Sequence, residues 1–146
     1  MQRHYCRLFL HSDHKNAPER VLAPSVLGIL NRSDNQSTAN LARAQYFRTI
    51  GFIQRSDLPR YSWSFDSREK IGVNETDPFV HVSWLLSQLN SLVHPSDYEH
   101  HGIEVSLAFY WGGNGTGGGP YISSKLAELL VQHKIGLDVG FYYEKV

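Results

Sequence analysis

The stretch that most constrains the fold is Ile103 to Ser123, where alternating apolar residues lead through a glycine-rich loop into a second short β-prone run. Val105, Leu107 and Phe109 fall on one side of an extended chain, and the residues between them fall on the other. This alternation predicts a strand over 103–111. Because the residues after the loop also favour an extended chain, we expect a central hairpin.

The length and the net charge of the chain limit the number of domains and the classes of function that we expect. The chain has 146 residues, and we expect a single α+β domain over residues 1–146. At this size about two-thirds of the unfolded chain's surface can be buried without help from disulfides or a metal. Lys plus Arg equals Asp plus Glu, so the formal net charge is zero. Without a global positive field, nucleic-acid binding is disfavoured as a function.

The single cysteine and the lack of long apolar runs indicate in which cellular compartment the protein is expected. Cys6 is the single cysteine, so no intrachain disulfide can form, and its strand-like surroundings predict a buried, unreactive thiol. The first 15 residues lack the apolar core and the cleavage site of a signal peptide. No run approaches the length of a membrane span. We expect a cytoplasmic protein with no membrane partner.

Residue patterns place the remaining elements. Four further segments are expected to be strands: 4–11, 44–53, 60–67 and 137–143. A polar loop is expected over 31–40 and a turn over 56–59.

Three helices are expected. The first begins at Ala17-Pro18, is interrupted by Pro24 and ends near Gly28. The second begins at Asp77-Pro78, and its residues at helical spacing form one apolar stripe: Val82, Leu85, Leu86, Leu89, Leu92 and Val93. The third follows Ser123 or Ser124, with Gly136 as the left-handed residue at its end. The order β-α-β-β-α-β-β-α-β predicts an antiparallel or mixed sheet with the helices on one face, of ferredoxin-like character.

Three short motifs are spread over most of the chain. They are Leu27-Gly28-Ile29, Trp63-Ser64, and a long third motif: Val105, Tyr110-Trp111, the glycine loop, Ile122-Ser123 and Leu137-Asp138-Val139. Together they resemble a bacterial family called domain of unknown function 4279, although the sequence departs from its pattern between Asn31 and Arg55. The resemblance implies a compact bacterial α+β domain. It implies no catalytic residues.

The glycine loop has the spacing of a phosphate-binding motif. Residues 113–118 read G-x-G-x-x-G, a pattern in which backbone amides can approach a pyrophosphate at the start of a helix. The residues that follow favour a strand, and no G-K-[ST] occurs. A flexible hairpin loop is therefore favoured, and such a loop could still close over a ligand.

The sequence contains one cluster of histidines and a carboxylate: His94, Asp97, His100 and His101. On a continuous helix some of these would share a face, but Pro95 interrupts it, and a solvated helix end is favoured over a metal site. No nucleophile elbow G-x-S-x-G is present. We assign no catalytic residue, no metal and no cofactor.

Aromatic residues supply the candidate binding contacts. Tyr110, Trp111 and Tyr121 flank the loop that contains Asn114, and if exposed they are candidate anchors for a partner. Trp63 completes the set. Trp63 could instead fill the core between the sheet and a helix. A further alternative for the aromatic residues as a set is that they stack nucleobases on an open sheet face.

These observations favour a non-catalytic protein-binding module over an enzyme, for example an immunity-type inhibitor that neutralises a toxin. The alternative is a small-molecule-binding domain or enzyme that uses the glycine-rich loop 112–119 and its flanking aromatics. The expected partner is another protein, and a homodimer remains open.

Overall fold

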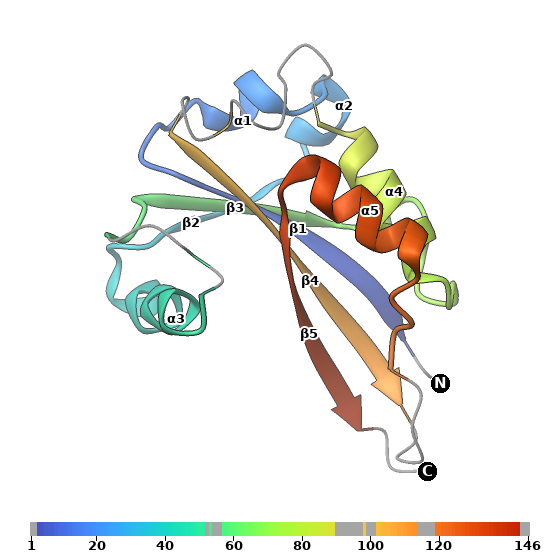
Figure 1. The fold of residues 1–146 in the computed structure, drawn as a ribbon. Coiled ribbons are helices and arrows are strands. Elements are labelled where there is room, and N and C mark those ends of the chain that lie inside the picture. Colours follow the sequence, from blue (N-terminus) through green and yellow to red (C-terminus); the bar gives the residue numbers. More distant parts are fainter. Residues whose placement is uncertain are drawn as a thin grey trace.

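β1 (His4–Ser12) and β4 (Ile103–Gly113) lie side by side at the centre of a five-stranded sheet of order β2-β3-β1-β4-β5 (Figure 1). The other strands are β2 (Asn31–Asp34), β3 (Tyr61–Asp66) and β5 (Gly136–Tyr143). The computed structural model describes residues 3–51, 53, 57–89, 98, 102–113 and 119–143, with the backbone alone for 141–143. The strands predicted over 4–11, 60–67, 103–111 and 137–143 are confirmed.

The sheet is mixed, and its parallel pair overturns the predicted central hairpin. β4 and β5 run parallel, with Phe109 opposite Val139. Parallel neighbours need a crossover, and α5 (Ser124–His133) provides it. Residues 119–123, expected to form the second strand of the hairpin, lie outside any strand.

The ferredoxin-like character is not confirmed. β3 is antiparallel to both β1 and β2, so β1 and β2 run in the same direction with β3 between them. Joined through α1 (Ala17–Val21) and α2 (Pro24–Leu27), they form a split β-α-β unit. α3 (Thr38–Thr49) and β5 are additional to that unit. The α+β class with a mixed sheet is confirmed.

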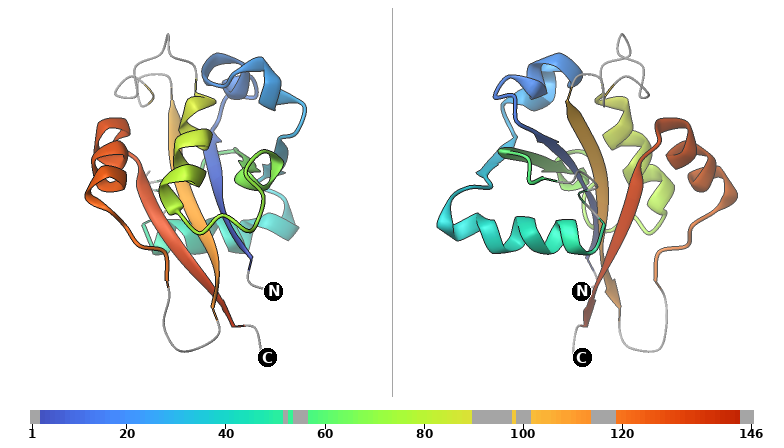
Figure 2. Two further views of the ribbon diagram at one scale, coloured as in Figure 1. Left: turned by 90° about the vertical axis from the view of Figure 1, so that its right-hand side faces the viewer. Right: turned by 60° about the vertical axis from the view of Figure 1, so that its left-hand side comes forward.

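One face of the sheet carries the main core. α1, α2, α4 (Pro78–Ser87) and α5 pack against it (Figure 2), and a short 3-10 helix, η1 (Ser67–Glu69), follows β3. Alternate residues of β1 point into this core: Cys6, Leu8 and Leu10. They meet the apolar stripe of α4, from which Val82, Leu85 and Leu86 are buried, and Leu89 just beyond the end of the helix is buried too. The predicted stripe residues Leu92 and Val93 lie outside the described residues.

α3 lies on the second face, behind the sheet as seen from α4 (Figure 2). The predicted strand over 44–53 is therefore wrong, as is the loop over 31–40, which instead contains β2 and the start of α3. Helices thus cover both faces rather than one. Good helix formers such as Ala, Leu, Arg and Gln fill 38–48, and Phe47 packs on Phe9 and Ala108.

Helix ends follow the predicted capping chemistry. The Asp77 side chain accepts a hydrogen bond from the Phe79 amide at 2.9 Å, and the Ser123 side chain accepts one from the Leu126 amide at 3.1 Å. The interruption at Pro24 is confirmed, because α1 and α2 are separate helices. The left-handed residue after α5 is Lys134, with φ 52°, while Gly136 begins β5. Within the described residues, no helix combines the length and apolar character needed to cross a bilayer.

Replacing Leu107 by alanine should destabilise the fold strongly, because Leu107 is fully buried at the centre of β4. Loss of its side chain should lower the free energy of unfolding by about 2–5 kcal/mol, measured by urea denaturation. Val131→Ala is the matched control, since Val131 is 75% exposed and should change stability by less than about 0.5 kcal/mol. Equal effects of the two substitutions would contradict this placement of the core.

Candidate functional site

The structure separates the predicted binding residues. Trp63 and Trp111 are only 4% and 3% exposed, and Trp111 packs between His4 and His81 with ring centroids 4.4 and 5.8 Å away. Both tryptophans therefore build the core. Tyr110 is half-buried on the second face, Tyr121 is 79% exposed before α5, and Asn114 lies outside the described residues.

Five residues at one end of the second face form a continuous set of contacts, which we call the arginine–tyrosine cluster: Tyr5, Arg7, Asp66, Arg68 and Tyr110. Tyr5 and Tyr110 are partners in the β1–β4 register, and their rings stack with centroids 4.9 Å apart and planes 15° apart. The Arg68 guanidinium lies 4.1 Å from the Tyr5 ring centroid, and that of Arg7 lies 5.3 Å from the Tyr110 centroid. These are cation–π distances.

Asp66 holds both arginines in place. Arg68 donates from Nε to Oδ1 at 2.9 Å and from Nη2 to Oδ2 at 2.8 Å, which is a bidentate pair. Nη2 of Arg7 lies 3.5 Å from Oδ2. Burial opposes the charge of Asp66, but the hydrogen bonds from Arg68 and the charges of both arginines outweigh it and hold the pKa of Asp66 below its usual value. Asp66 is therefore the negatively charged member of the cluster at neutral pH.

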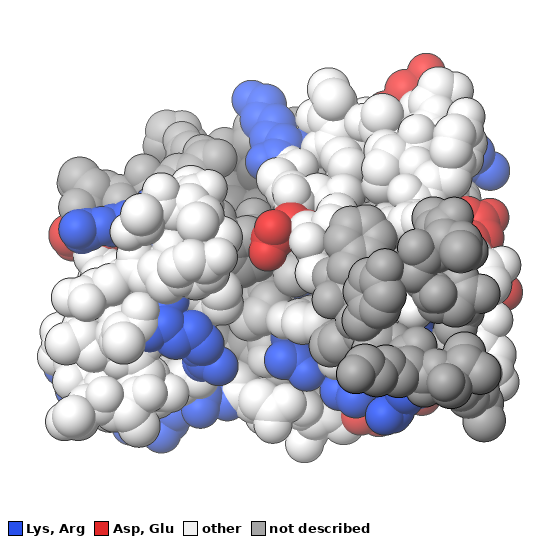
Figure 3. Space-filling view, turned by 90° about the horizontal axis from the view of Figure 1, so that it is seen from below, with Lys and Arg blue, Asp and Glu red and all other residues white. Residues whose placement is uncertain are grey.

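Neighbouring elements add further charges around Tyr110. Burial raises the pKa of Tyr110, and the charges of Arg7, of Asp138 in β5 and of Arg43 in α3 act on its phenol more weakly. Arg43 donates to the Ser33 hydroxyl at 2.9 Å and stays exposed. Figure 3 views the end of the molecule where β1 begins and β4 ends, and Lys and Arg side chains gather toward its centre and lower part. This end of the second face is polar and rich in arginine.

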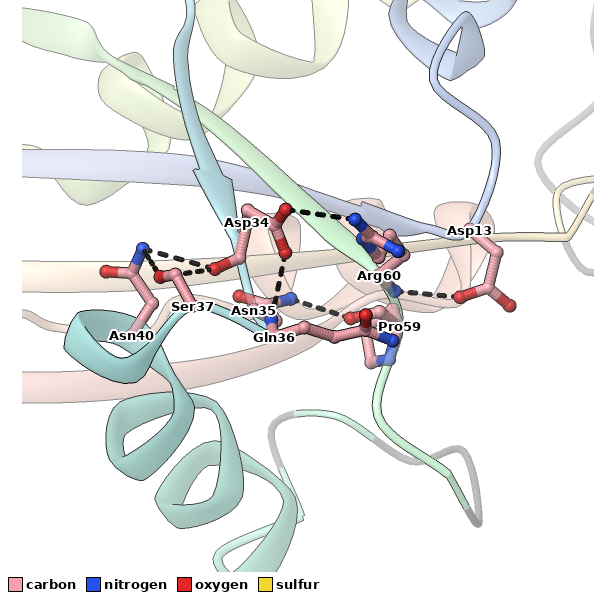
Figure 4. A network of polar contacts seen from close by, with 8 residues as sticks. All are labelled: Asp13, Asp34, Asn35, Gln36, Ser37, Asn40, Pro59 and Arg60. Carbon is pink, nitrogen blue, oxygen red and sulfur yellow. Dashed lines mark hydrogen bonds and ion pairs between the residues drawn. The ribbon is translucent and has the colours of Figure 1, made fainter.

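The N-terminus of α3 is fixed by a network that Figure 4 shows from close by. Asp34 accepts from the Gln36 amide at 2.9 Å and from Arg60 at 3.3 Å, and these interactions lower its pKa. Its backbone carbonyl accepts from Ser37 and Asn40 in the first turn of α3. Because Asp34 ends β2, this network ties α3, and with it Arg43, to the edge of the sheet.

A buried polar chain crosses three strands further along the second face. His11 of β1 has Ser62 Oγ of β3 at 2.8 Å from Nδ1 and Ser106 Oγ of β4 at 3.1 Å from Nε2. Asn35 donates to Ser62 Oγ at 2.8 Å and to the Pro59 carbonyl at 2.9 Å. All four polar side chains are buried. Mutual hydrogen bonding makes their burial tolerable.

A second serine–histidine pair lies on the main core side. Ser67 Oγ is 2.6 Å from His81 Nδ1, and His81 Nε2 is 2.9 Å from the Glu75 carbonyl oxygen. A carbonyl can only accept, so Nε2 carries a proton, and in the neutral imidazole Nδ1 then accepts from the Ser67 hydroxyl. The Ser67 oxygen accepts from the Cys6 amide at 3.0 Å. Every donor in this set has an acceptor.

Neither serine–histidine pair can reach a substrate as folded. Ser67, His11 and His81 are 0% exposed, and Ser62 is 8% exposed. Cys6 is also fully buried, and burial raises the pKa of its thiol well above the usual value, which disfavours the nucleophilic thiolate. These groups stabilise the fold. Neither pair was predicted from the sequence, because His11 and Ser62 meet only through the β1–β3 register, which a single sequence does not give.

Within the part of the chain that the structure describes, no group of three or more His, Cys, Asp or Glu side chains could hold a metal ion. The predicted cluster of His94, Asp97, His100 and His101 lies outside that part, as do residues 114–118 of the glycine loop. The cluster of Tyr5, Arg7, Asp66, Arg68 and Tyr110 was not predicted beyond Tyr110.

The chain matches no family model, no curated protein and no solved structure. The resemblance to domain of unknown function 4279 therefore stays a prediction.

Replacing Asp66 by asparagine should lower stability at neutral pH by about 1–3 kcal/mol, because a charged acceptor of the bidentate pair is lost. A lowered carboxyl pKa stabilises the fold above the unfolded value of 3.8, and this contribution is lost as the pH falls through the lower folded-state value. The difference between wild type and Asp66→Asn, measured by urea denaturation, should shrink below pH 3.8. A difference that stays constant into strong acid would contradict the assignment.

Replacing Ser67 by alanine should leave His81 Nδ1 without a donor and the Cys6 amide without an acceptor. The expected loss is about 1–3 kcal/mol in the free energy of unfolding. Ser124→Ala, at an exposed serine, is the matched control and should change stability by less than about 0.5 kcal/mol. If Ser67→Ala were as harmless as the control, the proposed hydrogen-bond order would be wrong.

Proposed function

We propose that this protein is a non-catalytic protein-binding module, such as an immunity-type inhibitor in the bacterial cytoplasm, and that the arginine–tyrosine cluster contacts the partner. The observation that carries the proposal is the composition and placement of the cluster. Tyrosine and arginine are among the residues that dominate binding energy at protein interfaces. In the cluster they are stacked and ion-paired before any partner arrives.

Preorganisation supports binding by this face. Arg68 is fixed at once by the Tyr5 ring and by two hydrogen bonds to Asp66, so less side-chain freedom is lost when a partner binds. Tyr110 is held by Tyr5 and by Arg7. Rigid aromatic and guanidinium groups of this kind offer contact area at a low entropic cost.

The burial of the serine–histidine pairs favours a binding role over an enzymatic one. Ser67, His81 and His11 would resemble catalytic groups by distance alone, but each is sealed inside the fold. The alternative function through the glycine loop relied in part on Trp111, which is buried. Tyr121 is the remaining exposed aromatic of that proposal.

Affinity capture from a lysate of the native organism tests the proposal. We expect one stoichiometric protein partner that Arg68→Ala weakens by about 2 kcal/mol, or about 30-fold, as at an interface hot spot. Arg20→Ala removes the same charge from the exposed surface of α1 and is the matched control, expected to retain the partner. Tyr121→Ala tests the alternative surface, which is formed by the glycine-rich loop and its flanking aromatic residues. An empty capture, or a partner that only Tyr121→Ala releases, would contradict the proposal.

A further inference from the structure

The arginine–tyrosine cluster buries its negative charge and leaves its positive charges nearer the surface. The Asp66 side chain is 10% exposed, while the side chains of Arg7 and Arg68 are 25% and 38% exposed. Arg43 adds a further exposed guanidinium from α3, and Asp138 of β5 is the carboxylate that faces Tyr110. Three arginines thus surround two carboxylates, one of them buried. A partner that approaches this end of the second face therefore meets three guanidinium groups and one exposed carboxylate, that of Asp138.

The hydrogen-bond donors of the Arg7 guanidinium are only partly paired with acceptors. Its Nε is buried and has no hydrogen-bond partner, and its Nη2 lies 3.5 Å from an oxygen of Asp66. That carboxylate is already engaged by the shorter bidentate pair with Arg68. A guanidinium has five N–H donors, and a donor hidden from water without an acceptor costs stability. A partner's carboxylate cannot reach the buried Nε, but the Arg7 side chain as a whole is 25% exposed, so its remaining donors can pair with a second carboxylate.

We propose that the arginine–tyrosine cluster binds an acidic segment of the protein partner, with carboxylates received by Arg7 and Arg68 and with Arg43 extending the positive surface along α3. This inference rests on the proposed function and specifies the chemistry of the partner. Planar guanidinium groups match carboxylates in geometry as well as in charge. Because the sites of positive charge are prepositioned, the partner contributes Asp or Glu side chains to a rigid surface.

A single-stranded nucleic acid is the competing occupant of an aromatic sheet face, and the contacts disfavour it. Nucleobases bind such sheets by stacking on open aromatic rings. Tyr5 is 9% exposed, since Arg68 lies against its ring and Tyr110 stacks on it. Arg7 lies over Tyr110. The ring faces of Tyr5 and Tyr110 are therefore covered, and the partly exposed groups of the cluster are guanidinium groups.

Fluorescence anisotropy with defined probes tests this inference without a known partner. The probes are a short labelled peptide of alternating glutamate and glycine, its lysine counterpart, and a labelled oligouridine, each at low and at physiological salt. We expect the glutamate peptide alone to bind wild type, and Arg68→Ala to weaken it about tenfold, the loss expected for a charge-assisted contact. Arg20→Ala should leave binding unchanged, because α1 lies away from the cluster (Figure 1).

Three results would overturn the inference: equal weakening by Arg68→Ala and Arg20→Ala, preference for oligouridine, or no binding of the glutamate peptide to wild type at low salt. Thermal denaturation of each variant establishes that it is folded, and Arg68→Lys, which keeps the charge but loses the bidentate geometry, should show an intermediate affinity. The proposed function has its own test, the affinity capture, and an empty capture would contradict it whatever the peptide probes show. A captured protein partner whose binding survives added salt and Arg68→Ala would overturn the acidic-segment inference and leave a binding module with another face.

Discussion

The antiparallel pairing of β1 with β4 is the constraint on which the rest of the structure depends. All nine residues of β1 have partners in β4, and this register decides which side chains face each side of the sheet. Cys6, Leu8 and Leu10 enter the main core, while Tyr5 and Arg7 face the other way. Since side chains alternate along a strand, a slip by one residue would move the cluster into the core.

The two faces are stabilised by different physics. The main face buries apolar residues under α4 and α5, and hydrophobic burial is its driving force. The second face buries polar groups that satisfy one another, as in the chain from Asn35 through Ser62 and His11 to Ser106. α3 covers this face with few apolar contacts, chiefly those of Phe47 with Phe9 and Ala108. A sheet face stabilised in this way can leave charged side chains at its end accessible to a partner.

Local patterns predicted much of the fold from sequence. Alternation gave the strands at β1, β3, β4 and β5, and the capping residues Asp77 and Ser123 gave two helix starts, because both signals lie within a few neighbouring residues. α3 was missed because its aromatic residues Tyr46 and Phe47 favour a strand locally. The helix is stabilised by hydrogen bonds between Asp34 and its first turn, and by the packing of Phe47 against Phe9 and Ala108 of the sheet.

The candidate site was less predictable, for a different reason. Tyr5 and Tyr110, like Arg7 and Asp66, are far apart in the chain and meet only through strand register, which a single sequence does not give. One error was avoidable. Tyr110 and Trp111 are consecutive residues of a strand, so they must point to opposite faces, and both could not be anchors on one surface. The buried member is Trp111.

The central claim is that the partner binds the second face at the arginine–tyrosine cluster. Amide chemical-shift mapping of the isotope-labelled protein, titrated with the captured partner, tests it most directly. We expect the largest changes at Tyr5, Arg7, Arg68 and Tyr110, with the outer face of α5 around Ala127 and Val131 unchanged. Changes confined to α5 and Tyr121, with the cluster unperturbed, would contradict the claim.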